Sequence, residues 1–342
     1  MLNVCKLSAF TRLLLIAALF SRSVLAVSIP IEDREPEAAT GLSHQISVSG
    51  KEFMIASANP YASEAGFNIL NKGGSAIDAA IAVQLMLTLV EPQSSGIGGG
   101  AFILHWSKSK QHLTTFNGRE TAPKAATADM FLDDKGKAIP WIKAVVGGRS
   151  VGVPGVLKAL KKAHQQFGKL PWQDLFYDAI KLAEHGFIVS PRLEKLLSME
   201  INPGVSQLSA SKSYFFPGGI PVKSGSLLKN KKLAQVYRSI AKQGVDAFYH
   251  GWIAEKIVAA VQHSVVAPGQ LTLEDLANYQ AKQSPAVCGN YHQYNVCGMG
   301  PPSSGGVAVI QTLGQLESFN LAQFMPNDPQ AVHLFTQSSR LA

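Results

Sequence analysis

Arg119 is the residue of this chain whose type and position are best suited to binding chemistry. It lies in Asn117-Gly118-Arg119-Glu120-Thr121-Ala122-Pro123, directly after a run that is typical of a strand. An arginine at a strand end beside a glycine can direct its planar guanidinium at a carboxylate through two parallel hydrogen bonds. A surface salt bridge is the alternative, and for a single arginine it is the more common outcome. The spacing by itself does not decide between the two.

Two glycine-rich runs contain the residue types of phosphate loops and serine nucleophiles, but their contexts differ from both. The run 94–101 (SSGIGGGA) follows a predicted helix and opens a strand, whereas nucleotide-binding loops open a helix. Close approach of the backbone explains these glycines better. The run 300–306 (GPPSSGG) lacks the Gly-x-Ser-x-Gly pattern, so Ser303 or Ser304 is interpreted as the cap of the following helix.

Metal and cofactor chemistry find no support in the sequence. The nine histidines stand singly, without a His-Glu-x-x-His or other paired spacing. We therefore predict neither a metal nor a cofactor. Lys and Arg exceed Asp and Glu by 31 to 23, but they are scattered and not clustered with aromatic residues, which argues against a nucleic-acid partner.

The interpretation of the three cysteines depends on whether the first segment of the chain is an export signal. Residues 1–26 combine basic Lys6 and Arg12, a short apolar stretch and a terminal Val-Leu-Ala, which predicts a cleaved signal peptide and a periplasmic or secreted protein. Cys5 would leave with it. Cys288 and Cys297 are symmetric about a hairpin turn at His292-Gln293, so directly opposed strands would bring them together. A disulfide and two free buried thiols both remain open.

The remaining residues predict one mixed α/β (α+β) domain over 51–342, after an exposed stretch at 27–50. The chain has 342 residues, of which 46% are hydrophobic and 16% charged, enough apolar material for a large core. No stable membrane span is predicted; 76–90 is interpreted as a buried helix. Strands are predicted at 53–57, 101–106, 113–117, 286–290 and 294–299. Helices are predicted at 61–71, 75–90, 155–167, 172–184, 226–243, 251–263, 272–277 and 305–317.

Several motifs, in order along 50–342, together resemble the gamma-glutamyltransferases (glutathione hydrolase proenzymes). They are Ala58-Asn59-Pro60, Ala62 to Gly66, Gly73 to Ala80, Glu91-Pro92 to Phe102, Gly118 to Pro123, Gly152 to Gly155 and Pro301 to Gly306. Each motif alone is weak, but the set is specific. The resemblance implies a glutathione-metabolising hydrolase and acyltransferase with the four-layer αββα fold of N-terminal-nucleophile hydrolases.

The resemblance also implies residue roles. In such enzymes a zymogen cleaves itself, and the threonine exposed at the start of the small subunit attacks the gamma-glutamyl amide, with its own amine as base. The glutamyl group then passes to water or to an amino acid or peptide. The arginine matching Arg119 grips the α-carboxylate of the donor.

The same likeness places the catalytic threonine beyond residue 342, so no catalytic residue is assigned in this chain. We expect the fold to be incomplete at its C-terminal end, with exposed strand edges, and the chain by itself to be inactive without the small subunit. The alternatives are a non-catalytic remnant and a related acylase of the same superfamily. Acceptor preference and oligomeric state stay open.

Overall fold

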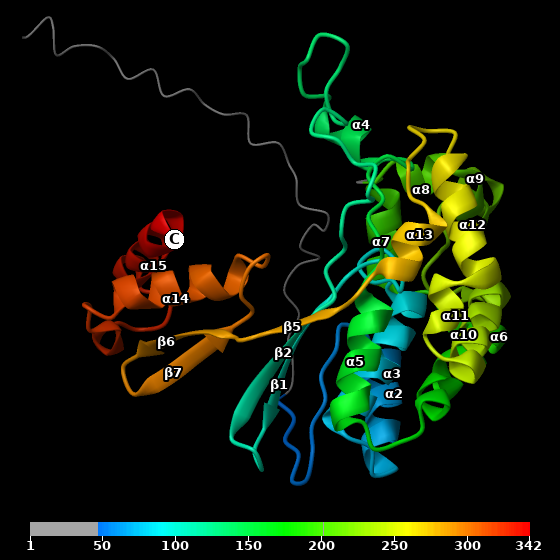
Figure 1. The fold of residues 1–342 in the computed structure, drawn as a ribbon. Coiled ribbons are helices and arrows are strands. Elements are labelled where there is room, and N and C mark those ends of the chain that lie inside the picture. Colours follow the sequence, from blue (N-terminus) through cyan, green and yellow to red (C-terminus); the bar gives the residue numbers. More distant parts are fainter. Residues whose placement is uncertain (1–46, 201) are drawn as a thin grey trace, which may run out of the picture. The chain divides into compact units, whose positions relative to one another are not determined.

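The computed structural model describes residues 47–200 and 202–342 of the chain (Figure 1). These residues all fall in one unit, Pro36–Ala342, defined by its internal contacts. The predicted signal peptide at 1–26 and most of the stretch 27–50 lie outside the described residues. Within the described part, no helix has the length and apolar character needed to cross a bilayer.

Two helices, α2 (Pro60–Asn71) and α3 (Ala76–Val90), form an antiparallel pair near the N-terminal end of the described chain. Both begin at strong caps. The Asn59 side chain accepts from the N–H of Tyr61, and Ser75 forms a capping box with Asp78. Gly73 has a φ of +83°, which a residue with a side chain adopts only with strain, and it turns the chain between the helices. The predicted helices 61–71 and 75–90 are confirmed within one residue.

Further helices pack around this pair and enclose the main hydrophobic core (Figure 1). The longer ones are α5 (Val156–Phe167), α6 (Tyr177–His185), α7 (Pro191–Ser198), α10 (Lys231–Gln243) and α12 (Gly251–Gln262). The shorter ones are α4 (Trp141–Val145), η1 (Trp172–Phe176), α8 (Gly204–Gln207), α9 (Ser209–Phe215), η2 (Pro217–Gly219), α11 (Asp246–Tyr249) and α13 (Leu273–Asn278). The core includes the fully buried rings of Phe176 in η1 and Tyr237 in α10.

A three-stranded antiparallel sheet carries the segment that ends at Arg119. Its order is β1 (Phe102–Ser107), β2 (His112–Asn117) and β5 (Lys282–Ser284). Helix α5 packs against β2, where Phe116 is fully buried and meets Phe167 edge to face at 6.2 Å between ring centroids. The sheet and α5 together therefore fix the position and direction of the segment that follows β2 and leads to Arg119.

A small second sheet pairs β3 (Phe187–Ile188) with β4 (Leu227–Leu228). The C-terminal part consists of the hairpin β6 (Val287–Tyr291) and β7 (Tyr294–Gly298), then α14 (Gly305–Leu316), η3 (Leu321–Gln323) and α15 (Pro329–Leu341). Gly289 packs against Ile310, so α14 covers one face of the hairpin. The mixed arrangement of helices and short sheets agrees with the predicted α/β class.

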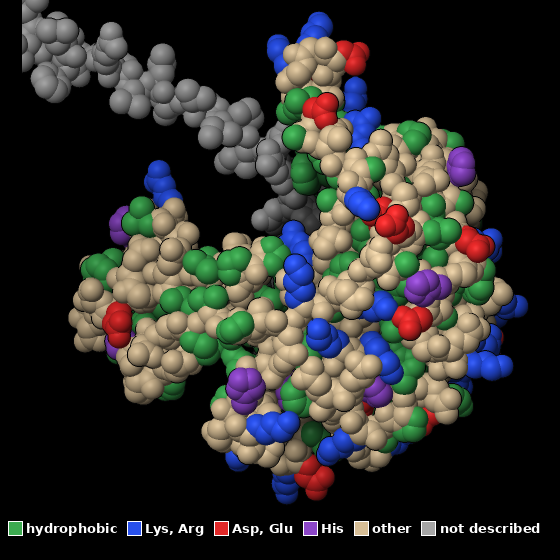
Figure 2. All heavy atoms as spheres, in the orientation of Figure 1, with side chains coloured by type: hydrophobic (Ala, Val, Ile, Leu, Met, Phe, Trp, Pro, Cys, Tyr) green, Lys and Arg blue, Asp and Glu red, His purple; other side chains and the backbone are tan. Residues whose placement is uncertain are grey.

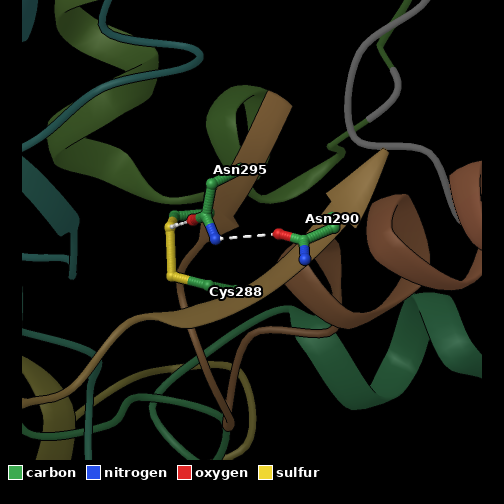
Figure 3. The surroundings of a disulfide bond; sticks show 4 residues. Cys288, Asn290 and Asn295 are labelled. Carbon is green, nitrogen blue, oxygen red and sulfur yellow. Dashed lines mark hydrogen bonds between the residues drawn. A yellow bond between two sulfur atoms is a disulfide. The ribbon is translucent and has the colours of Figure 1, made fainter. Parts of the chain in front are cut away.

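The hairpin register places Cys288 directly opposite Cys297, as the sequence predicts. Their Cα atoms are 4.1 Å apart and their sulfurs are bonded, so the structure selects the disulfide over two free thiols. Beside it, the Asn295 side-chain amide donates to Asn290 Oδ1 at 3.1 Å (Figure 3). The bridge is on the hairpin face opposite α14.

Thiol titration checks this bridge. Denatured, exported protein prepared without reductant should contain no free thiol, and reduced protein should contain two. Because the bridge closes a short loop, with a sequence separation of 9, its removal in Cys288→Ser/Cys297→Ser should cost about 2–3 kcal/mol of unfolding free energy. Two free thiols before reduction would contradict the bridge.

Two sequence predictions are wrong in detail. Residues 53–57 form no strand; they run extended, and Ile55 packs onto Gly66 of α2, where no described strand offers backbone partners. The helix predicted at 226–243 begins only at Lys231, because the Asn230 side chain accepts from the N–H of Leu233 and caps it there. Leu227 and Leu228 belong instead to β4.

Strand edges and apolar side chains are exposed in the described part of the chain. No described strand pairs with the outer edge of β1 or with a second edge of β6 or β7. Exposed apolar side chains of the C-terminal part include Val309, Met325, Val332 and Phe335. Figure 2 shows hydrophobic side chains over α14 and the hairpin on the face it presents. These features agree with the expectation of exposed edges.

Candidate substrate-binding site at Arg119

Arg119 lies two residues beyond the end of β2, and its side chain is exposed. Its backbone is held on both sides: its N–H donates to Asn117 Oδ1 at 2.9 Å, and its carbonyl accepts from the Tyr279 hydroxyl at 2.8 Å. No carboxylate of the described residues forms an ion pair with its guanidinium. The backbone is therefore fixed while the charged group stays free to meet an anion.

Three glycines from segments far apart in the chain, Gly99, Gly118 and Gly155, lie close together next to Arg119. A Cβ on Gly118 would lie 2.5 Å from the Ala159 side chain and 2.9 Å from the Gly155 carbonyl. The carbonyl of Gly99 accepts from the N–H groups of Gly155 and Val156 at 2.9 and 3.1 Å. The glycine-rich run 94–101 thus approaches the first turn of α5 backbone to backbone, which agrees with the close backbone approach that the sequence predicts.

The segment after Arg119 is held by the turn before α5. Thr121 and Val153 exchange two backbone hydrogen bonds, of 3.4 and 2.8 Å. A Cβ on Gly152 would lie 2.9 Å from the Glu120 side chain. The motifs 118–123 and 152–155, far apart in the chain, are therefore one structural unit.

Two buried tyrosines support this unit, and sequence reasoning missed both. Tyr279 donates to the carbonyl of Arg119, and Tyr249 donates to the carbonyl of Pro154 at 2.9 Å. Their rings are nearly parallel, with centroids 6.3 Å apart. Burial raises the pKa of Tyr279 to about 12, with a smaller contribution from the Glu120 charge, and burial also raises the pKa of Tyr249. Both hydroxyls therefore remain protonated donors at neutral pH.

A buried polar contact connects two more of the recognised motifs. Asn59, the cap of α2, donates from Nδ2 to Glu91 Oε1 at 2.7 Å. The backbone carbonyl of Glu91 accepts from Ser94 and Ser95, each at 3.0 Å, where the glycine-rich run begins. Arg192 Nε lies 3.4 Å from Glu91 Oε2. The start of the run is thereby tied to the α2–α3 pair.

The motif 301–306 lies apart from these contacts. Ser303 Oγ accepts from the N–H of Gly305 at 3.3 Å, whereas Ser304, at the N-cap position of α14, makes no side-chain cap. No hydrogen bond or ion pair between described residues joins this motif to Arg119 or to its supporting glycines. The part of the chain that the structure describes contains no group of three or more His, Cys, Asp or Glu able to hold a metal.

The chain is similar to known proteins along most of its length. The family model Gamma-glutamyltranspeptidase matches residues 62–342. The "Glutathione hydrolase proenzyme" of Bacillus subtilis (strain 168) is 39% identical over 329 residues, which are 96% of this chain and 55% of that protein. The "Acylase ACY 1 proenzyme" of Pseudomonas sp. (strain SE83) is 34% identical over 86% of this chain and 53% of that protein.

The fold is similar as well. The crystal structure of Helicobacter pylori gamma-glutamyltranspeptidase matches with a TM-score of 0.81 at 34% identity, covering 86% of this chain and 83% of that one. Gamma-glutamyltranspeptidases such as this one are N-terminal-nucleophile hydrolases, in agreement with the predicted fold class. The chain spans about half the length of the curated relatives it matches. With the family model covering all but the first 61 residues, the chain belongs to the gamma-glutamyltranspeptidase family.

Proposed function

We propose that these residues form the donor-binding part of a gamma-glutamyl hydrolase and acyltransferase. The observation that carries the proposal is the exposed guanidinium of Arg119, which pairs with no carboxylate of residues 47–200 and 202–342 and extends from a backbone held by Asn117 and Tyr279. A bidentate pair with the α-carboxylate of glutathione or another gamma-glutamyl donor suits this geometry. Because the backbone of Arg119 is already held, only its side chain has to be ordered when the donor binds.

The rest of the reaction follows from family membership. A threonine at the start of the small subunit would take up the glutamyl group from the amide, and water or an amino acid or peptide would accept it. We propose that this threonine is outside residues 1–342, so that the chain acts only together with the small subunit. The basic and apolar composition of residues 1–26 supports action in the periplasm or outside the cell.

Arg119→Lys tests the proposal in a completed precursor, in which a family segment carrying the threonine follows residue 342. Lysine keeps the charge but lacks the planar fork. We expect the KM for a chromogenic gamma-glutamyl anilide to rise by roughly tenfold or more, with self-cleavage and kcat retained.

Arg238→Lys is the matched control, because Arg238 pairs with Glu184 on the surface and should tolerate the change. An unchanged donor KM in Arg119→Lys would overturn the proposal that Arg119 binds the α-carboxylate of the donor. The unaltered chain alone, assayed in parallel, should release no anilide; release would place a nucleophile within its 342 residues.

A second candidate is an acylase, since the Pseudomonas relative named as one is 34% identical to this chain. The two functions differ in their need for a free α-carboxylate beside the scissile acyl group. Turnover of an acyl anilide without that carboxylate, unaffected by Arg119→Lys, would favour the acylase. A completed precursor that cleaves itself but turns over neither substrate would indicate a non-catalytic remnant.

A further inference from the structure

A cavity of about 290 Å³ lies between the 123–132 segment and the 268–270 turn. Its lining combines polar side chains (Arg149, Asp129, Thr127 and Gln270) with apolar ones such as Met130 and Leu132, and it does not include Arg119. It is thus separate from the candidate donor site. Its volume suits a ligand the size of an amino acid.

The backbone around Arg149 lies in direct contact with the 266–267 segment. The N–H of Arg149 donates to the carbonyl of Ala267 at 2.7 Å, and the N–H of Gly148 donates to the carbonyl of Val266 at 3.3 Å. Ala267 has a φ of +44°, a conformation that costs energy for a residue with a side chain.

Glycines allow this contact. A Cβ on Gly148 would overlap the carbonyl of Val261, and a Cβ on Gly269 would overlap the carbonyl of Gly148. Only glycine permits the two segments to touch at these points. The backbone of Arg149 is therefore held in place, as the backbone of Arg119 is.

Arg149 and Asp129 bring opposite charges to one cavity without pairing. No ion pair among the described residues includes either side chain, so their charged atoms are more than 4.0 Å apart. The Thr127 hydroxyl and the Asp129 backbone lower the pKa of Asp129 by hydrogen bonding, so it stays ionised at neutral pH. A ligand with both charges would satisfy both residues at once.

We propose that this cavity binds a small zwitterion, an apolar free α-amino acid, with Arg149 holding its carboxylate and Asp129 its ammonium group. The apolar side chain would contact Met130 and Leu132. The proposal does not rest on the proposed transfer reaction, because binding at this cavity requires neither Arg119 nor turnover.

Isothermal titration calorimetry of the unaltered chain with L-leucine tests the proposal. We expect saturable one-to-one binding. N-acetyl-L-leucine, which has no ammonium group, and L-leucinamide, which has no carboxylate, should each bind at least about tenfold more weakly. These ligand arms need no mutation, so failure to fold cannot obscure them. Equal binding of all three ligands, or no saturable binding of L-leucine, would overturn the proposal.

Variants then assign the site. Arg149→Gln and Asp129→Asn should each weaken L-leucine binding by about tenfold, whereas Arg238→Gln should leave it unchanged. Arg119→Gln distinguishes the two sites: loss of leucine binding in that variant alone would move the ligand to the donor site and overturn the assignment to this cavity. Circular dichroism spectra of the variants verify that each is folded.

Discussion

Asp78→Ala should lower the unfolding free energy of the protein by about 3 kcal/mol, because it leaves three backbone N–H groups without their acceptor. The Asp78 side chain is fully buried. Its Oδ2 accepts from the N–H of Ser75 at 2.8 Å, of Lys169 at 2.9 Å and of Leu170 at 3.1 Å. One carboxylate therefore holds both the start of α3 and the turn that follows α5. Alanine supplies no acceptor for these three N–H groups.

Urea denaturation followed by circular dichroism measures the effect. Asp133→Ala is the matched control, since Asp133 also accepts two backbone N–H bonds, from Lys135 and Lys137, but in an exposed turn where water can replace it. We expect a cost of about 1 kcal/mol or less there. Asp78→Asn, which keeps one acceptor oxygen, should be intermediate. Equal costs for Asp78→Ala and Asp133→Ala would show that burial of the carboxylate does not matter.

Gly155→Ala should be similarly damaging, for a purely steric reason. Gly155 has a φ of −124°, which alanine adopts without strain. Its added Cβ, however, would overlap the Tyr279 hydroxyl and the Gly118 carbonyl. The carbonyl belongs to buried backbone and cannot rotate away as a side chain can. We expect a loss of about 3 kcal/mol in stability, together with a weaker Arg119 site, because the Tyr279 bond to Arg119 must also shift.

Gly314→Ala in α14 is the matched control, since a Cβ there meets no atom within 4 Å. That change should be neutral or stabilise by up to about 1 kcal/mol. The double variant Gly155→Ala/Tyr279→Phe removes the hydroxyl, but the ring carbon that carried it and the Gly118 carbonyl still overlap the new Cβ, and the bond to the Arg119 carbonyl is lost. It should therefore recover little of the lost stability. Gly155→Ala with the thermal stability of the unaltered protein would refute the packing argument.

Local sequence patterns were sufficient to predict most of the helices and strands. The helical spacing of apolar residues and the Gly73-Gly74 stop predicted α2 and α3 within one residue, and the structure adds the caps Asn59 and Ser75 that begin them. The symmetric spacing of Cys288 and Cys297 about a two-residue turn likewise fixed their register in the hairpin. The family motifs, read as a set, also indicated the gamma-glutamyltranspeptidase family that the family model supports.

Which of these elements contact one another depends on the three-dimensional fold. The Gly118–Gly155 contact, the Tyr279 bond to Arg119 and the attachment of Asp78 to Lys169 join residues 37 to 160 positions apart, and no local pattern encodes such pairs. The predicted strand at 53–57 failed for the same reason. Its alternation is suitable for a strand, but a strand also requires a neighbouring backbone, and the fold places α2 there instead.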